Sequence, residues 1–132
     1  MIKKDIGWKV VSVIEGKLHS SSSCFLFDVE YFVDRFVSRK EGFGPLCLFK
    51  TLKAARQYCI NFKKSNPYSM KIFKAEYIPS EDKALWYVEP FQNSHITNRV
   101  ELKDLKSEYT VALHLIKTED FITADQIKLL KE

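Results

Sequence analysis

The spacing of apolar and polar residues predicts a chain built mainly from β-strands. Residues 8–14 are β-branched and alternate in polarity, which is typical of a half-buried strand. Glu15 and Gly16 follow as a turn, so residues 8 to about 22 are expected to form a hairpin. The same kind of pattern predicts further strands over 46–49, 70–78, 84–88, 99–102 and 109–117.

One segment has the periodicity of a helix, residues 51–64. Thr51 is suited to cap its first turn, because a threonine hydroxyl can accept a hydrogen bond from a free backbone amide there. Leu52, Ala55, Cys59 and Phe62 then recur at spacings of three, four and three, which places them on one helix face. We expect this helix to pack on one face of the sheet.

Two segments fit either a strand or a helix. In residues 25–37, aromatic and β-branched side chains favour extended structure for part of the segment. In residues 123–132, Thr123 and Gln126 have the spacing of a helix capping box, whereas Ile127 and Leu129 alternate as in a strand.

These elements predict a single α+β domain over residues 1–132. We expect a mostly antiparallel sheet of five to seven strands with one principal helix, about residues 51–64, on one face. A chain of 132 residues has the usual size of one domain and can bury a core without a metal or a disulfide. The predicted core contains Trp8, Val10, Leu46, Leu48, Leu52, Ala55, Cys59, Phe62, Phe73, Ala75, Trp86 and Leu113.

The charge of the chain permits a polyanionic partner without requiring one. The formal net charge is +4 and the pI is about 8.9. On a helical wheel, four basic residues gather about 130° from the centre of the apolar stripe, with Ile60 among them. We define this basic helix face as Lys53, Arg56, Lys63 and Lys64, and it is the predicted nucleic-acid-binding site.

The sequence contains no recognisable catalytic, metal or cofactor motif. His19, His95 and His114 do not have the spacing of metal ligands, so neither a metal nor a cofactor is expected. The segment GFGPL differs from a phosphate-binding loop because a strand follows it where such a loop opens a helix. No catalytic residue is assigned.

The cysteines and the apolar runs favour a cytosolic protein. Cys24, Cys47 and Cys59 make an odd count without a CxxC pair, which is typical of a reducing compartment. No apolar run approaches the length of a membrane span, and no signal peptide is recognised, so no membrane partner is expected.

The order of these segments resembles small uncharacterised prokaryotic and phage-type domains. The resemblance rests on the KVV strand at the start, the GFGPLCLF strand with the alanine-containing helix after it, and the closing IKLL strand. It implies that the C-terminal segment is a strand and that the origin is prokaryotic or viral. It supplies no catalytic residues.

The function expected from the sequence is a non-catalytic binding module. Its partner would be nucleic acid or another protein, contacted through the basic helix face. The sequence is also compatible with a homo-oligomer. The alternative is a small enzyme of the cysteine or transferase type, with a site assembled from Cys24 and a histidine.

Overall fold

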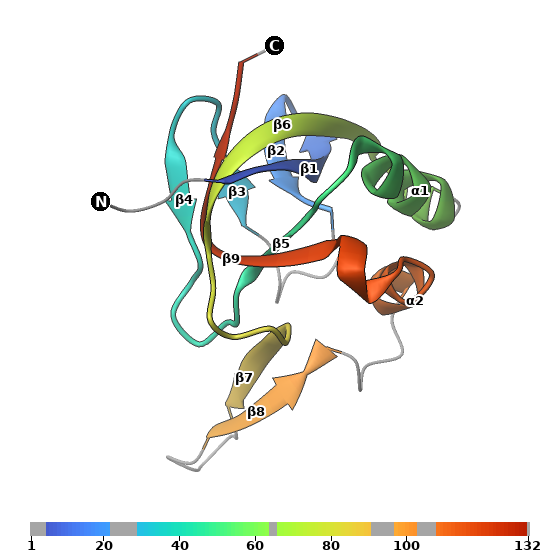
Figure 1. The fold of residues 1–132 in the computed structure, drawn as a ribbon. Helices are drawn as coiled ribbons and strands as arrows, with labels where there is room; N and C mark the ends of the chain where they lie inside the picture. Colours follow the sequence, from blue (N-terminus) through green and yellow to red (C-terminus); the bar gives the residue numbers. More distant parts are fainter. Residues whose placement is uncertain (1–4, 22–28, 64–65, 91–96, 103–107, 132) are drawn as a thin grey trace.

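The fold is known from a computed structural model that describes residues 5–21, 29–63, 66–90, 97–102 and 108–131. Its centre is a closed barrel of four antiparallel strands: β1 (Asp5–Ile14), β5 (Leu46–Phe49), β6 (Ser69–Pro79) and β9 (Phe121–Leu129). β1 pairs with β5 and β6, and β9 pairs with the same two strands, which closes the ring (Figure 1). The pairing between β1 and β5 is short, because it consists of the single residue pair Trp8 and Phe49.

Three short strands extend the barrel into a seven-stranded sheet. β2 (Lys17–Ser20) pairs with β1 across a turn in which Glu15 and Gly16 both have positive φ, as the predicted hairpin requires. β3 (Glu30–Tyr31) extends β2, and β4 (Phe36–Ser38) pairs with β9. The strand predictions for the hairpin and for the C-terminal segment are therefore confirmed. Of residues 25–37, those after residue 28 are partly extended, and residues 25–28 lie outside the described part of the chain.

The predicted helix is present as α1 (Leu52–Phe62) and lies on one side of the barrel (Figure 1). The Thr51 hydroxyl accepts a hydrogen bond from the Ala54 amide at 3.0 Å, which confirms the predicted cap. The buried side chains are Ala54, Ala55, Tyr58 and Phe62, whereas Leu52 and Cys59 are only partly buried. The buried face is therefore centred nearer Tyr58 than the periodicity indicated.

A second helix replaces a predicted strand. Residues 109–117 were expected to be extended, but the chain forms α2 (Glu108–His114), beside α1, followed by the short helix η3 (Thr118–Asp120). Ala112 and Ile116 are four residues apart and both pack in the helix-side core, whereas Leu115 is 65% exposed. This one-sided burial matches a helical turn, which is why the apparent alternation was misleading. His114, which lies within that predicted strand, is exposed.

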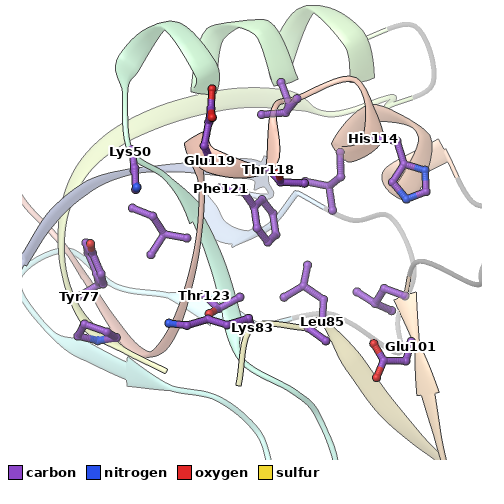
Figure 2. Close-up of a pocket in the computed structure, with 16 residues that line it drawn as sticks. Lys50, Tyr77, Lys83, Leu85, Glu101, His114, Thr118, Glu119, Phe121 and Thr123 are labelled. Carbon is purple, nitrogen blue, oxygen red and sulfur yellow. The ribbon is translucent and has the colours of Figure 1, made fainter. Parts of the chain in front are cut away.

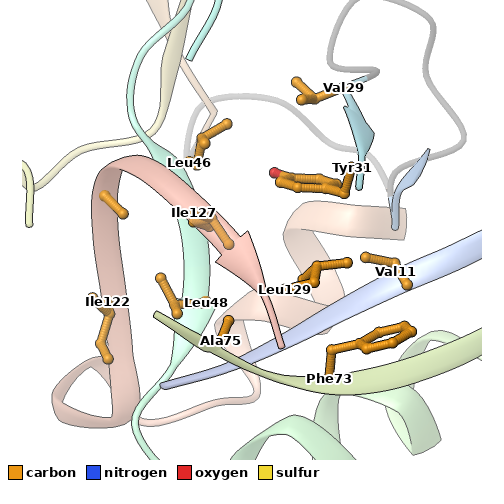
Figure 3. Packing of buried hydrophobic residues seen from close by; sticks show 11 residues of the cluster. Val11, Val29, Tyr31, Leu46, Leu48, Phe73, Ala75, Ile122, Ile127 and Leu129 are labelled. Carbon is orange, nitrogen blue, oxygen red and sulfur yellow. The ribbon is translucent and has the colours of Figure 1, made fainter. Parts of the chain in front are cut away.

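The barrel separates two hydrophobic cores. The barrel-interior core contains Val11, Leu48, Phe73, Ala75 and Leu129 and appears in Figure 3. The helix-side core joins Val10, Cys47 and Phe49 of the barrel to Tyr58 and Phe62 of α1, with the rings of Phe49 and Tyr58 5.4 Å apart. Of the predicted core, Trp8, Leu52, Cys59, Trp86 and Leu113 are partly exposed and the remainder is buried.

A separate two-stranded sheet, β7 (Trp86–Pro90) and β8 (Thr97–Glu101), lies at one end of the barrel (Figure 1). It is fastened to the segment before β5, where the Gly44 amide donates to the Trp86 carbonyl at 2.6 Å. A Cβ atom at Gly44 would lie 2.7 Å from Trp86 Cδ1, so only glycine lets the two segments approach this closely. This contact holds the start of β7 beside the segment that leads into β5.

Candidate ligand-binding pocket

A pocket of about 730 Å³ lies between the first half of β9, α2 and the base of the β7–β8 sheet (Figure 2). Its volume is within the range of small-molecule sites, and most of the surface that lines it is apolar, although half of the lining residues carry a polar group. The lining comes from six parts of the chain and consists of Lys50, Tyr77, Pro79, Lys83, Ala84, Leu85, Glu101, Leu102, Leu113, His114, Ile116, Thr118, Glu119, Phe121, Ile122 and Thr123.

A hydrogen-bonded turn before β7 forms one wall. The Ser80 hydroxyl accepts from the Asp82 amide at 3.1 Å, and Asp82 Oδ1 accepts from the Ala84 amide at 3.1 Å. Trp86 Nε1 donates to the other carboxylate oxygen of Asp82. These short-range bonds are the usual way in which serine and aspartate order a turn, and here they hold Ala84 at the pocket.

The other walls are held by backbone bonds between segments. The Lys50 amide donates to the Asp120 carbonyl at 2.9 Å, which ties the end of β5 to η3. The Leu102 amide donates to the Leu85 carbonyl at 2.8 Å, which closes the β7–β8 sheet at its pocket end. The walls are therefore fixed by main-chain contacts, as expected of a largely pre-formed site.

One polar group inside this apolar surface has no hydrogen-bond partner. Thr123 is 4% exposed, and its Oγ1 atom makes no hydrogen bond within the described part of the chain. A buried hydroxyl without a partner is costly, and native structures rarely contain one without a reason. Because Thr123 lines the pocket, a ligand atom placed there can complete this hydroxyl's hydrogen bonding.

The ionisable residues of the pocket are divided between its two ends. In Figure 2 the amines of Lys50 and Lys83 lie toward the side of Tyr77, whereas Glu101 and His114 lie at the opposite side. The carboxylate of Glu119 is directed away from the other labelled side chains (Figure 2). The pocket thus has a cationic end, an apolar middle and an end with a carboxylate and an imidazole.

The predicted nucleic-acid-binding residues lie elsewhere. Lys53 and Arg56 are exposed on α1, Lys63 is exposed at its C-terminal cap, and Ile60 is 65% exposed. Lys64 lies outside the described residues, and none of the other three lines the pocket. The structure brings three basic residues to one helix face as expected, and their binding role stays a prediction.

The described residues do not test the alternative of a cysteine or transferase-type enzyme. Cys24 and His95 both lie outside them, so the pairing of Cys24 with a histidine stays a prediction. Within the described ranges, no three His, Cys, Asp or Glu side chains gather in a way that could hold a metal ion. Cys47 and Cys59 are free thiols, and burial raises the pKa of Cys59, which makes it less reactive.

A buried lysine is a second unexpected feature. Lys9 is 5% exposed, its amine donates to the Cys47 carbonyl at 2.7 Å, and it lies 5.0 Å from the centre of the Tyr31 ring. Burial lowers the pKa of this amine, and the neighbouring Cys47 acts in the opposite direction. The cavity beside Lys9 is only about 60 Å³, too small for a substrate, so its contacts are structural.

Sequence reasoning missed the pocket. In the sequence, Thr123 was considered only as part of a helix capping box with Gln126, and no motif indicates a ligand there. The one usable signal was that Thr123 is the single polar residue in the apolar run from Phe121 to Ala124. A single hydroxyl in a strand is common, however, and does not by itself indicate a site.

Comparisons with known proteins do not add a family to this geometry. Neither protein-family models, nor curated protein sequences, nor solved structures gave a match. The resemblance to small prokaryotic and phage-type domains therefore stays an expectation. None of the helices in the described ranges has the length and apolar character needed to cross a bilayer.

Proposed function

We propose that this chain is a non-catalytic binding module whose ligand occupies the pocket between β9, α2 and the β7–β8 sheet. The observation that carries the proposal is the unpartnered hydroxyl of Thr123, 4% exposed, within an apolar pocket of about 730 Å³. A ligand atom that bonds this hydroxyl would remove its desolvation cost, and the apolar lining would supply the remaining affinity. The free thiols of Cys47 and Cys59 support a cytosolic setting. The prokaryotic or viral origin rests on the resemblance in sequence.

The test uses phenylnaphthylamine, an uncharged apolar probe whose fluorescence rises in apolar surroundings. We expect saturable, one-to-one binding to the parent protein and a loss of at least tenfold in affinity in Ala84→Phe, where the larger side chain occupies the pocket. Ile6→Phe is the matched control, because Ile6 is 47% exposed on β1 and does not line the pocket. Circular dichroism checks that both variants are folded.

Two results would contradict the proposal. The first is a parent protein that does not bind the probe at concentrations where its solubility allows detection. The second is a folded Ala84→Phe variant that binds as tightly as the parent, because the probe would then lie outside the pocket.

A second candidate function is contact with a polyanion through the basic helix face. The observation that favours it is the joint exposure of Lys53, Arg56 and Lys63 around Ile60, which is itself 65% exposed. Such contact would be weak and nearly independent of sequence, because phosphate contacts do not read bases. It would also be sensitive to salt, with a slope of roughly −3 to −4 in log affinity against log salt for four contacts.

A salt titration of nucleic-acid binding tests this second function. Replacing Lys53, Arg56, Lys63 and Lys64 by Gln should abolish the slope. The control replaces Lys17, Lys74, Lys117 and Lys131, which are exposed on other surfaces, so that both variants lose the same charge. Equal binding by the two variants would mean that the overall charge, and not this face, attracts nucleic acid.

A further inference from the structure

The cationic end of the pocket comes from two elements that meet beside β9. Lys50 follows β5, and its Nζ atom makes neither a hydrogen bond nor an ion pair with any residue that the structure describes. Lys83 lies in the turn before β7, and its Nζ atom donates to the Ser80 carbonyl at 2.8 Å. An ammonium carries three protons, so Lys83 retains two donors for a ligand.

Backbone contacts place this cationic end next to the unpartnered hydroxyl. The Ser80 amide donates to the Thr123 carbonyl at 3.1 Å, and Ser80 is also the residue that holds Lys83. The ammonium of Lys83 and the hydroxyl of Thr123 therefore belong to one wall of the pocket, as Figure 2 also shows. A hydroxyl beside ammonium groups is well placed to donate to an anionic oxygen.

The middle of the pocket offers the opposite chemistry. Leu85, Leu113 and Phe121 line the pocket and come from the turn before β7, from α2 and from β9. Figure 2 shows Leu85 and Phe121 between the lysine end and the side of Glu101 and His114. Both Glu101 and His114 lie across the pocket from Lys50 in Figure 2. A ligand with its charge at one end and an apolar body at the other would match this arrangement.

We propose that the ligand of this pocket is a small amphipathic anion. Its carboxylate or phosphate group binds Lys50, Lys83 and the Thr123 hydroxyl, and its apolar body lies against Leu85, Leu113 and Phe121. This inference rests on the proposed function and deepens it by naming the ligand class. Charge-assisted bonds to the headgroup set the preference, and burial of the apolar body supplies most of the affinity.

The experiment compares four ligands with the same alkyl chain and different headgroups: octanoate, octyl phosphate, octanol and octylamine. Competition against phenylnaphthylamine gives each affinity for the parent protein. We expect octanoate or octyl phosphate to bind about tenfold or more tightly than octanol, because the hydrogen bonds involve charged groups. Octylamine should bind most weakly. The order of the two anions identifies the headgroup.

Two variants assign the preference to the lysine end. Lys50→Gln and Lys83→Gln should each reduce the ratio of octanoate to octanol affinity several-fold. Lys74→Gln is the control, because Lys74 is exposed on β6 and does not line the pocket. Because both lysines are exposed, their replacement should not unfold the protein.

The outcomes separate this inference from the proposed function. Binding of octanol as tight as that of octanoate, with no effect of either lysine variant, would overturn the anion preference and leave the pocket function standing. The tightest binding by octylamine would also overturn it, in favour of the end formed by Glu101 and His114. Absence of binding by all four ligands and by the probe would refute the proposed function itself.

Discussion

At the scale of single residues, both unexpected side chains lie on strands that are buried on two faces. Lys9 points toward the Tyr31 ring and the Cys47 carbonyl, whereas its neighbours Val10 and Trp8 pack on the helix side. Strands β1 and β5 pair only at Trp8 and Phe49. The Cys47 carbonyl of β5 therefore accepts a hydrogen bond from the Lys9 side-chain amine and not from a backbone amide of β1. In a strand with one face in water, Lys9 would lie on the exposed face, but β1 is buried on both faces in this region.

We predict that Lys9 makes the free energy of unfolding increase with pH in the alkaline range. Burial lowers the pKa of Lys9, so between its folded-state pKa and about 10.5 the unfolded chain binds more protons than the folded one. The free energy of unfolding should therefore rise with pH over this window more in the parent than in Lys9→Met. Urea denaturation of both proteins from about pH 7 to about pH 10 measures the difference.

The comparison with Lys9→Met isolates this effect from other groups. Burial raises the pKa values of Tyr58 and Tyr77, which lowers stability as the pH rises above about 10, but both tyrosines are present in the two proteins. If the parent and the variant had the same pH dependence, the Lys9 amine would not be buried beside the Cys47 carbonyl and the Tyr31 ring.

At the scale of elements, the sequence predicted α1 well and α2 wrongly. Around α1 the cap at Thr51, the spacing of apolar residues and the preceding strand all agree. In α2 the residues Val111, Leu113 and Leu115 alternate as in a strand, but Ala112 and Ile116 are the ones buried. Which of these residues are buried depends on the packing of α2 against α1, and the local sequence pattern does not contain this information.

We predict a large difference in stability between two substitutions on α1. Phe62 is 1% exposed and packs 5.5 Å from the Tyr58 ring, so Phe62→Ala should lower the free energy of unfolding by about 3–5 kcal/mol. Ile60 is 65% exposed, so Ile60→Ala should change it by no more than about 0.5 kcal/mol. Urea denaturation of the two variants decides, and equal costs would contradict the orientation of α1.

At the scale of the whole molecule, the fold class followed from the sequence but the pocket did not. Strand patterns were enough to predict a mostly antiparallel α+β domain, and the structure confirms it. The closed barrel requires pairing between β1 and β5 and between β6 and β9, which local patterns do not encode. The pocket likewise takes Lys50, Leu113 and Thr123 from separate elements of the chain, which only the tertiary structure brings together.

The basic helix face can be predicted from the sequence, whereas the pocket cannot. Lys53, Arg56 and Lys63 lie on one helix, so their common face follows from helical geometry alone. The residues of the pocket come from segments up to 73 positions apart, between Lys50 and Thr123. Local periodicity carries no information about such a site.

The central claim is that the pocket holds a buried hydroxyl for a ligand, and Thr123→Val tests it most directly. Without ligand, this variant removes an unpartnered buried hydroxyl, so its free energy of unfolding should rise by about 1 kcal/mol. Thr51→Val is the matched control: it removes a hydroxyl that caps α1, so its free energy of unfolding should fall by about 1 kcal/mol.

The same variant is then titrated with octanoate. The account predicts that Thr123→Val is more stable than the parent and binds octanoate about tenfold more weakly, because the hydroxyl is costly when the pocket is empty and bonded when it is occupied. A variant that is less stable than the parent and binds octanoate equally well would contradict it, because the Thr123 hydroxyl would then serve the fold and not a ligand.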